Sequence, residues 1–445
     1  MPSKCLLVLL DGLGDRAYSQ LDQRTPLQAA RTPNLDRLAA LGCNGLYHAA
    51  ALGQALPSEN AHFAMFGYSP AEFPGRGALE ALGAGIPLAQ GEVAFLAHLV
   101  ELAVVDGALQ LATDHPRAPS EEIDALVAAL STYPQGEQTI RFLPHQGGSG
   151  VLLLNGSQVS PFVTDTNIFT KGRILPEPQP WQEYAADPAA VKTALLLGDY
   201  LRWVYNQLDR HPVNRQRRRR GLYPINGLVT QRGGRGKQVP DFAARNGLRG
   251  LSISSGVVYW GLAAFLGMAV RKVKDGKEPG LDLAHRLQLA TDALVDFDFI
   301  HVHTKAPDAA AHAKDPLGKV KVIEALDRGI GEALPSLLAD PEVLLVVTSD
   351  HSTPSAGPLV HSGEPVPLTF VGGGVRVDGV DRFDEVAVAG GALGTVRGGE
   401  FINLVINFLD RAKLAGLRDS PHDLAYWPGP CPPLRLTGSA KKEQP

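Results

Sequence analysis

Acidic, histidine and serine side chains beside expected strand ends and at helical spacing are the most informative residues of this sequence. They are Asp11, Ser58, Asp308, His312, Asp350, His351 and His361. Carboxylate and imidazole groups together suit divalent ions such as Zn²⁺ or Mn²⁺. A pair of such ions about 4 Å apart can clamp both oxygens of an in-line phosphoryl transfer. The combination therefore predicts a two-metal centre for phosphate chemistry.

Buried strands are expected to carry the first and last acids of this set to one edge of a sheet. The apolar run 6–10 ends in Asp11, and the run 343–348 leads to Asp350 and His351. Unbroken apolar runs of this length are typical of parallel strands that are covered on both faces. Open α/β sheets bind ligands beyond the carboxyl ends of their strands, so the two strand ends can share one site.

Helical spacing accounts for the other candidates. Asp308 and His312 follow the apolar stretch 297–304 and are four residues apart, which places them on one face of a helix. Ser58 follows a proline at the start of an amphipathic run, the position of a helix N-terminus. There the helix dipole favours anions, and an adjacent metal can make the hydroxyl a nucleophile.

Each residue alone has a simpler interpretation. Aspartates at strand ends often cap helices, and Ser58 can be an ordinary N-cap. An Asp and a His four apart on a helix are usually a solvated pair. The joint pattern is what favours a site.

A series of motifs that follow one another over most of the chain carries a resemblance to a known family. They are LLDGLGDR (9–16), TPLQAARTPNLDRLAALGCNGL (25–46), PSENAH (57–62), GRGALEALGAGI (75–86), HPVNRQRRRRGLYPIN (211–226), HTKAPDAAAH (303–312), SDHSTP (349–354), HSGEPVPL (361–368) and GALGTVRG (391–398). With them the chain resembles the alkaline phosphatase superfamily, and within it the archaeal-type cofactor-independent phosphoglycerate mutases. The resemblance implies an α/β fold with a mainly parallel sheet flanked by helices and an inserted α+β domain.

The resemblance also implies cofactors and their ligands. It implies two divalent metal ions, Mn or Zn with Mg possible, and no 2,3-bisphosphoglycerate. One metal would be held by Asp11, Ser58, Asp350 and His351, and the other by Asp308, His312 and His361.

Catalytic and substrate-binding roles follow from the same resemblance. Ser58 would accept the phosphoryl group and return it, and Lys305 matches a family lysine near the transferring phosphate. The basic residues of two Gly-rich stretches match family positions that hold a substrate anion; they are Arg76, Arg232 and Lys237. Gly-rich basic loops are also ordinary turns, so both interpretations of these three residues stay open.

The chain departs from the family pattern where phosphoglycerate should be recognised. The stretch FLAH (95–98) has Leu96 in place of an arginine, and residues 106–118 keep only Arg117. TDTNIF (164–169) and HQGGSGVLLL (145–154) differ as well. Losing an arginine contact in a partly desolvated site costs about 2–5 kcal/mol.

Three functions are therefore weighed. The first is interconversion of 3-phosphoglycerate and 2-phosphoglycerate, with relocated basic groups such as the arginine run 215–220. The second is a related phosphotransferase or phosphatase that acts on another small phosphorylated metabolite. The third is a non-catalytic metal-binding or interaction protein, which the retention of all seven positions argues against. The arginine run itself is expected to be a solvated helix or loop.

The order of the motifs predicts the domains. Site residues occur near both ends of the chain, so we expect a discontinuous metal-binding domain of residues 1–87 and 246–420. Residues 88–245 would form an inserted substrate or lid domain, and residues 428–445 a disordered tail. In the insertion we expect a hairpin at Asp106-Gly107, a helix at 120–130 with a capping box from Ser120, and a long helix at 190–208.

The composition limits the classes of partner that the protein is expected to bind. The 42 Lys+Arg against 46 Asp+Glu give a net charge of −4, which does not suit a nucleic-acid-binding protein. The apolar stretch 253–270 contains glycines and serines and is expected to be a buried helix rather than a membrane span. The N-terminus runs directly into Asp11 without a secretory signal, so a cytoplasmic location is expected. The sequence leaves the oligomeric state open.

Overall fold

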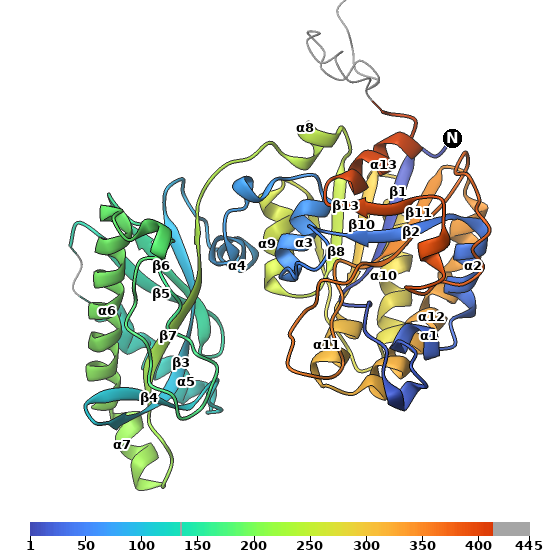
Figure 1. Cartoon of the computed structure of the whole chain (residues 1–445). Coiled ribbons are helices and arrows are strands. Elements are labelled where there is room, and N and C mark those ends of the chain that lie inside the picture. Colours follow the sequence, from blue (N-terminus) through green and yellow to red (C-terminus); the bar gives the residue numbers. More distant parts are fainter. Residues whose placement is uncertain (134–135, 413–445) are drawn as a thin grey trace, which may run out of the picture.

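The computed structural model of the protein describes residues 1–133 and 136–412. Figure 1 shows two bodies side by side, each built around its own β-sheet. The larger one, the core sheet, has eight strands in the order β13-β2-β12-β11-β1-β10-β8-β9. These strands are β1 (Lys4–Leu10), β2 (Cys43–His48), β8 (Gly250–Ser254), β9 (Ala269–Lys272), β10 (Phe299–Thr304), β11 (Val343–Thr348), β12 (Val366–Val371) and β13 (Gly394–Arg397).

Most of the core sheet is parallel. Strands β9, β8, β10, β1 and β11 run parallel in neighbouring pairs, whereas β12 is antiparallel to β11 and β2. Strands β10 and β11 are buried along their whole length, as expected for central strands covered on both faces. The predicted α/β class with a mainly parallel sheet is confirmed.

Helices cover both faces of the core sheet. On one face lie α3 (Ser58–Met65), α4 (Arg76–Gly83), α8 (Phe242–Asn246), α9 (Val257–Phe265) and α13 (Glu400–Phe408). On the other lie α1 (Pro26–Ala29), α2 (Pro33–Leu41), α10 (Pro279–Ala293) and α12 (Pro316–Ala339). The short helix α11 (Ala306–His312) follows β10. Successive side chains of β1 point to opposite faces of the sheet and so contribute to both hydrophobic cores. Leu7 and Leu9 pack on the first face, and Leu6 and Val8 pack on the second.

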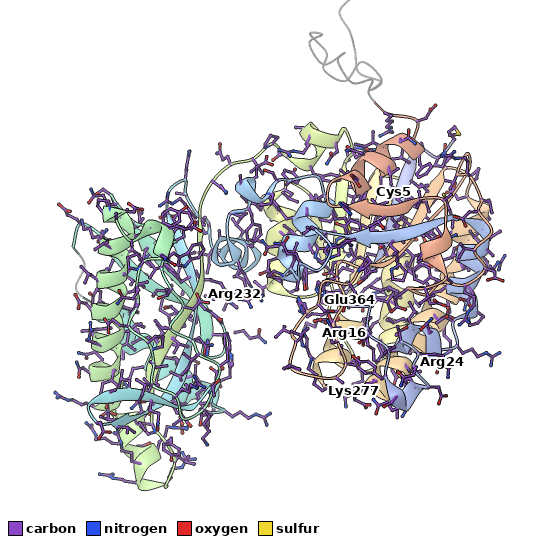
Figure 2. All side chains as sticks on the ribbon, in the orientation of Figure 1. Cys5, Arg16, Arg24, Arg232, Lys277 and Glu364 are labelled. Atoms are coloured by element: carbon purple, nitrogen blue, oxygen red, sulfur yellow. The ribbon has the colours of Figure 1, made fainter. Side chains whose placement is uncertain are left out.

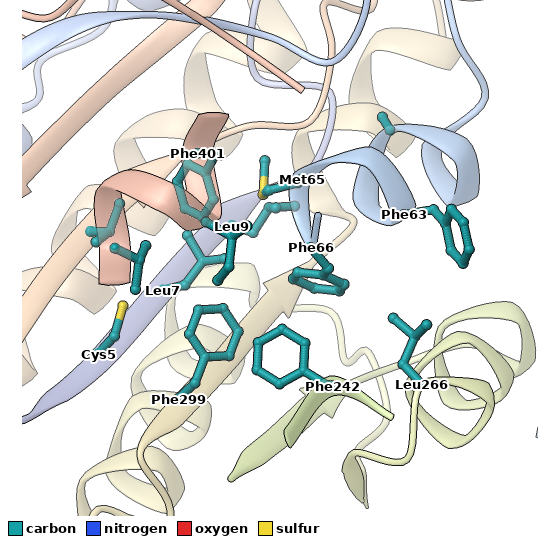
Figure 3. Packing of buried hydrophobic residues seen from close by; sticks show 14 of the residues in the cluster. Cys5, Leu7, Leu9, Phe63, Met65, Phe66, Phe242, Leu266, Phe299 and Phe401 are labelled. Carbon is teal, nitrogen blue, oxygen red and sulfur yellow. The ribbon is translucent and has the colours of Figure 1, made fainter. Parts of the chain in front are cut away.

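Aromatic side chains fill the first of these two cores. Figure 3 shows Leu7 and Leu9 of β1 beside Phe299 of β10, with Phe66 and Phe242 packed against them. The rings of Phe66 and Phe299 meet edge to face, with centroids 6.0 Å apart. This packing fixes the helix that begins at Ser58 against the strands that carry the acids.

The second body contains the inserted sheet, with strand order β4-β3-β6-β5 and β7 paired with β3. Its strands are β3 (Val93–Val105), β4 (Ala108–Thr113), β5 (Thr139–Gln146), β6 (Ser149–Asn155) and β7 (Ile225–Arg235). Its helices are α5 (Ser120–Ala129), α6 (Pro188–Asp209) and α7 (Pro212–Arg219). The sheet lies between β2 and β8 in the sequence, as an insertion does; the exact limits of 88–245 stay a prediction.

Several local predictions can be compared with these elements. The hairpin is confirmed, and its turn has Asp106 and Gly107 at φ +50° and +77°. The long helix is confirmed as α6. The capping box is wrong, because Pro119 is the N-cap of α5 and Ser120 is already helical. The stretch 253–270 is helical only over α9, between the strands β8 and β9.

The arginine run is helical but not wholly solvated. Arg217 of α7 is 3% exposed and forms ion pairs of 2.8 and 2.9 Å with Glu101 and Glu122. Figure 1 shows α7 at the end of the inserted body that is remote from α3 and α11. The structure thus gives this run a packing role and does not bring it to the acids.

The remaining predictions concern the ends and the surface. The expected tail at 428–445 lies outside the described residues. Within residues 1–133 and 136–412, no helix is both long and apolar enough to cross a bilayer. At the surface, Arg16 and Glu364, both labelled in Figure 2, form an ion pair with Arg16 Nε 2.7 Å from Glu364 Oε1.

Candidate active site

Neighbouring strand ends bring the predicted acids together. Asp11 follows β1 and Asp350 follows β11, and these strands pair in parallel. The backbone N–H of Gly12 donates a hydrogen bond of 3.1 Å to Asp350 Oδ1. Gly12 has φ +65°, and a Cβ there would lie 2.6 Å from Thr353 Oγ1 and 2.7 Å from Asp308 Cβ. Only glycine fits this turn, where three segments of the site meet.

The first predicted group of ligands is assembled around one imidazole. His351 Nε2 lies 2.9 Å from Ser58 Oγ, 3.1 Å from Asp350 Oδ2 and 3.5 Å from Asp11 Oδ1. All four residues are buried. The Ser58 hydroxyl therefore faces the acids and is not an N-cap, because the N-cap of α3 is Pro57.

The second group is assembled around one carboxylate. Asp308 Oδ1 lies 3.2 Å from His312 Nε2, one turn further along α11, and 3.6 Å from His361 Nε2. The predicted placement of Asp308 and His312 on one helix face is confirmed. The groups adjoin, because the rings of His351 and His361 stack with centroids 3.8 Å apart. All seven predicted ligand positions are thus brought together.

The buried oxygens of this cluster fit divalent cations. Asp11 Oδ1, Asp308 Oδ2 and Asp350 Oδ2 are buried and accept no hydrogen bond from the described residues. Burying carboxylates without donors is costly, whereas cations are suitable partners for them. Although burial opposes its charge, the carboxylates of Asp350 and Asp11 raise the pKa of His351 to about 9. The cluster therefore attracts positive charge strongly.

A cavity of about 370 Å³ opens beside Ser58 and is lined by basic side chains. Lys305 lies at its wall, with Nζ 3.5 Å from Asp308 Oδ2. Burial opposes the charge of Lys305, yet the carboxylates of Asp11 and Asp308 raise its pKa, so it is a cation at neutral pH. A phosphate in this cavity would meet both the serine and the ammonium group.

Two predicted arginines line the same cavity from different elements. Arg76 begins α4, and Arg232 lies in β7 of the inserted sheet. The buried carboxylate of Glu59 lies between them, 3.6 Å from Arg76 Nη1 and 3.5 Å from Arg232 Nη1. Figure 2 shows Arg232 where the two bodies meet. The cavity is therefore formed by both bodies.

The third predicted basic residue, Lys237, lies further from the serine. It lines an adjoining cavity of about 890 Å³, together with Arg76 and Arg232, and its Nζ donates a hydrogen bond of 2.8 Å to the carbonyl of Ala71. Lys237 does not line the cavity beside Ser58.

Several residues around the acids were not foreseen. Tyr259 donates its hydroxyl to Asp11 Oδ2 at 2.7 Å, and His303 Nε2 lies 2.9 Å from the same oxygen. Thr353 donates to Asp308 Oδ1 at 2.8 Å. His303 has a weak sequence signal, as a polar residue inside an apolar strand run. Tyr259 has none, because only tertiary packing brings α9 to Asp11.

A buried lysine supports the site from behind. Lys319 of α12 is fully buried, and its Nζ donates hydrogen bonds of 2.8 to 3.0 Å to the carbonyls of Gly12, Gly14 and Thr353. It also forms an ion pair of 3.0 Å with Asp15. The ammonium group ties the turn after β1 to the segment after β11, and thereby holds Asp11 and Asp350 in register.

Comparison with known proteins gives consistent matches over nearly the whole chain. The model of the Metalloenzyme superfamily matches residues 3–407. The chain is 39% identical to 2,3-bisphosphoglycerate-independent phosphoglycerate mutase 2 of Methanocaldococcus jannaschii, over 96% of this chain and 97% of that one. It is 35% identical to the 2,3-bisphosphoglycerate-independent phosphoglycerate mutase of Methanopyrus kandleri, over 93% of this chain and 98% of that one.

Solved structures agree. A protein from Pyrococcus horikoshii superposes with a TM-score of 0.76 at 30% identity, covering 94% of this chain and all of its own. A cofactor-independent phosphoglycerate mutase from Thermoplasma acidophilum superposes with a TM-score of 0.65 at 29% identity. The match covers 92% of this chain and all of that one.

Proposed function

This chain belongs to the 2,3-bisphosphoglycerate-independent phosphoglycerate mutases of the Metalloenzyme superfamily, and on that premise we propose that it interconverts 3-phosphoglycerate and 2-phosphoglycerate. The observation that carries the proposal is the position of Ser58. Its hydroxyl lies 2.9 Å from His351 Nε2, within the acidic cluster and at the wall of a cavity that also contains Lys305. A nucleophile, a ligand set and a cation for phosphate therefore share one space.

We assign the metal ligands as the family resemblance implies. Asp11, Ser58, Asp350 and His351 would hold one ion, and Asp308, His312 and His361 the other. Three carboxylates, three imidazoles and a hydroxyl suit Mn²⁺ or Zn²⁺ better than Mg²⁺, which prefers oxygen ligands. When bound, such ions lower the pKa of a coordinated hydroxyl and neutralise phosphoryl oxygens.

The residues of the chain then perform an exchange in two halves. Ser58 Oγ loses its proton and attacks the phosphorus in line, the P–O bond to the glycerate oxygen breaks, and that oxygen takes up a proton as phosphoserine forms. In the second half the other hydroxyl of the same glycerate loses its proton and attacks the phosphoserine, the P–O bond to Ser58 breaks, and Ser58 Oγ takes up a proton. Lys305 stabilises the charge that develops on the phosphoryl oxygens in both halves.

Substrate binding falls to the arginines. Arg76 and Arg232 come from the two bodies and converge on the cavity, where their planar guanidinium groups can bind carboxylate or phosphate. Glu59 between them fixes their positions in the absence of substrate. Lys237, in the adjoining cavity, would act at longer range.

The products of one incubation test this function. The full chain, loaded with Mn²⁺, is mixed with 3-phosphoglycerate and followed by phosphorus NMR. We expect a 2-phosphoglycerate signal that grows to equilibrium with little free phosphate. Free phosphate as the main product would show that water takes the phosphoryl group and would replace the mutase by a phosphatase. No change at all would mean a different phosphorylated substrate.

A further inference from the structure

Two histidines and an aspartate of the inserted sheet come together away from Ser58. His98 lies in β3, and Asp114 and His115 directly follow β4, the strand paired with β3. One ligand atom from each residue lies within 4.8 Å of the others. We propose that His98, Asp114 and His115 form a further metal site, which binds a divalent transition-metal ion such as Zn²⁺.

The carboxylate joins the two imidazoles. Asp114 Oδ1 lies 2.6 Å from His98 Nε2, and Asp114 Oδ2 lies 4.0 Å from His115 Nε2. The longer distance is beyond a hydrogen bond, so the ring of His115 gains no such bond from this carboxylate. An ion between the three side chains would displace to solvent the proton through which His98 Nε2 bonds to Asp114, and would use one lone pair from each residue. Two imidazoles and a carboxylate, with positions left for water, are a common ligand set for zinc.

The backbone holds His115 in place over His98. The rings are stacked with centroids 3.9 Å apart and planes at 11°. His115 has a left-handed φ of +49°, a strained backbone conformation for a residue other than glycine. This conformation turns the chain after β4 back toward β3. Both imidazoles therefore approach Asp114 before any ion binds.

Burial differs among the three side chains in a way that suits an ion from solvent. The side chain of His98 is 4% exposed and that of His115 is 60% exposed. The buried histidine provides a fixed ligand, and the exposed one leaves a path for the ion.

The site lies on the face of the inserted sheet that packs against α4. Side chains alternate along β3, so Ala94 and His98 share one face. Ala94 packs against Ala81 of α4, whereas Phe95 and Ala97 pack in the core that includes α6. Figure 1 shows α6 on the outer side of the inserted body and α4 between the two bodies. The proposed ion would therefore add positive charge on the inner face.

This cluster also accounts for two segments that the family resemblance left unexplained. His98 ends the stretch FLAH (95–98), and Asp114 and His115 lie within 106–118. Both stretches lack the arginines expected there. The pairing of β3 with β4 brings together the residues of these two segments, which both differ from the family pattern.

Counting ions tests the proposal without reference to activity. The full chain is stripped with a chelator, equilibrated at a fixed free Zn²⁺ concentration and analysed for zinc per chain. We expect His115→Ala and Asp114→Asn each to bind one ion fewer than the unaltered protein. The matched control is His285→Ala, an exposed histidine of α10, which should bind the full number. Equal zinc content in all four proteins would overturn the proposal.

Anomalous diffraction at the zinc edge gives the location. A peak between His98, Asp114 and His115 in crystals of the zinc-loaded chain is expected, and peaks only around Ser58 would overturn the site. This map also decides the matter if a substitution prevents folding. Because neither readout uses turnover, failure of this proposal and failure of the mutase assignment are distinguishable.

Discussion

Single side chains around Ser58 divide into those that would hold cations and those that would hold an anion. The carboxylates of Asp11, Asp308 and Asp350 are buried with oxygens that accept no hydrogen bond from the described residues. Lys305 lies at the boundary between the two kinds, beside Asp308 and inside the cavity. Its charge is therefore available to a phosphate without being needed as a metal ligand.

Substitution of this lysine should affect the rate and leave the metals in place. We expect Lys305→Met to lower kcat by about 10²–10³, the range for the loss of one preorganised electrostatic group. Metal content should not change, because the ammonium group is not a ligand. Steady-state kinetics and elemental analysis measure the two effects. The control is Lys321→Met, an exposed lysine of α12, and equal kinetics for both variants would contradict the role.

The arginines are expected to act on binding. Arg76→Met should raise KM at least tenfold with a smaller effect on kcat, since it removes a guanidinium group that contacts the substrate in ground and transition states alike. Arg210→Met, at the exposed C-terminal end of α6, is the matched control. A change in kcat alone would place Arg76 at the reacting atoms instead.

The residues themselves were largely predictable, and their supporting partners were not. Asp11, Asp308 and Asp350 were identified because strand ends and helical spacing are local patterns. Tyr259 and His303 bond to Asp11 although they lie 248 and 292 residues away in the chain, and no local pattern records that contact.

At the scale of elements, tight turns position the site as much as the strands do. The turn after β1 allows Gly12 to lie against Asp308 and Thr353. Gly85 also has a positive φ, of +79°, but a Cβ there would meet nothing within 4 Å. Both glycines adopt a positive φ, but only at Gly12 would a Cβ meet neighbouring side chains.

Substituting each of these two glycines separates the cost of a strained backbone from the cost of steric overlap with neighbouring side chains. Gly85→Ala should lose about 1 kcal/mol of unfolding free energy from the left-handed backbone alone. Gly12→Ala should lose about 1–3 kcal/mol more, because the new methyl group displaces Asp308 or Thr353. Urea denaturation measures both. Equal losses would show that the turn after β1 has room to relax.

A carboxylate before β10 predicts a pH dependence of stability. Asp298 accepts hydrogen bonds from the backbone N–H and the guanidinium group of Arg249. Burial opposes its charge, yet these bonds lower its pKa in the folded protein. A folded pKa below the unfolded value stabilises the fold above pH 4, and this contribution is lost as the pH falls through the folded pKa.

Replacing this carboxylate should remove that dependence. Asp298→Asn is expected to cost about 1 kcal/mol at pH 7 and much less at pH 3, since the pair is partly exposed. Chemical denaturation at the two pH values checks the difference. The same cost at both values would mean that the charge of Asp298 contributes nothing.

Elements were predicted well where the pattern was long or the turn distinctive. The hairpin at Asp106-Gly107 and the helix α6 are of this kind. The capping box at Ser120 failed because Pro119, whose fixed φ suits a helix start, occupies the N-cap position. The prediction of one helix over 253–270 is wrong outside α9, because apolar composition alone cannot separate a buried strand from a buried helix.

On the scale of the whole molecule, the site lies where the two bodies meet. Arg232 reaches the cavity beside Ser58 from the inserted sheet, whereas Arg76 reaches it from α4. The arrangement of the two bodies could be expected in outline from the order of the motifs, since the site residues occur near both ends of the chain. The contact of Arg232 with Glu59 could not, because it depends on the relative orientation of two sheets.

Closure of the two bodies over substrate is the expected motion. A mutase must keep water from the phosphoserine, and closure of a lid does this. We expect small-angle scattering to show a smaller radius of gyration with 3-phosphoglycerate than without it. Matching profiles would indicate that the two bodies do not move and that water is excluded by other means.

The central claim is that Ser58 carries the phosphoryl group, and the Ser58→Ala variant tests it most directly. The unaltered protein and the variant, loaded with the same metal and checked for metal content, are incubated with 3-phosphoglycerate and followed by phosphorus NMR. The account predicts 2-phosphoglycerate from the unaltered protein and none from the variant, although the variant keeps its metal ions. Formation of 2-phosphoglycerate by the metal-loaded variant would contradict the account.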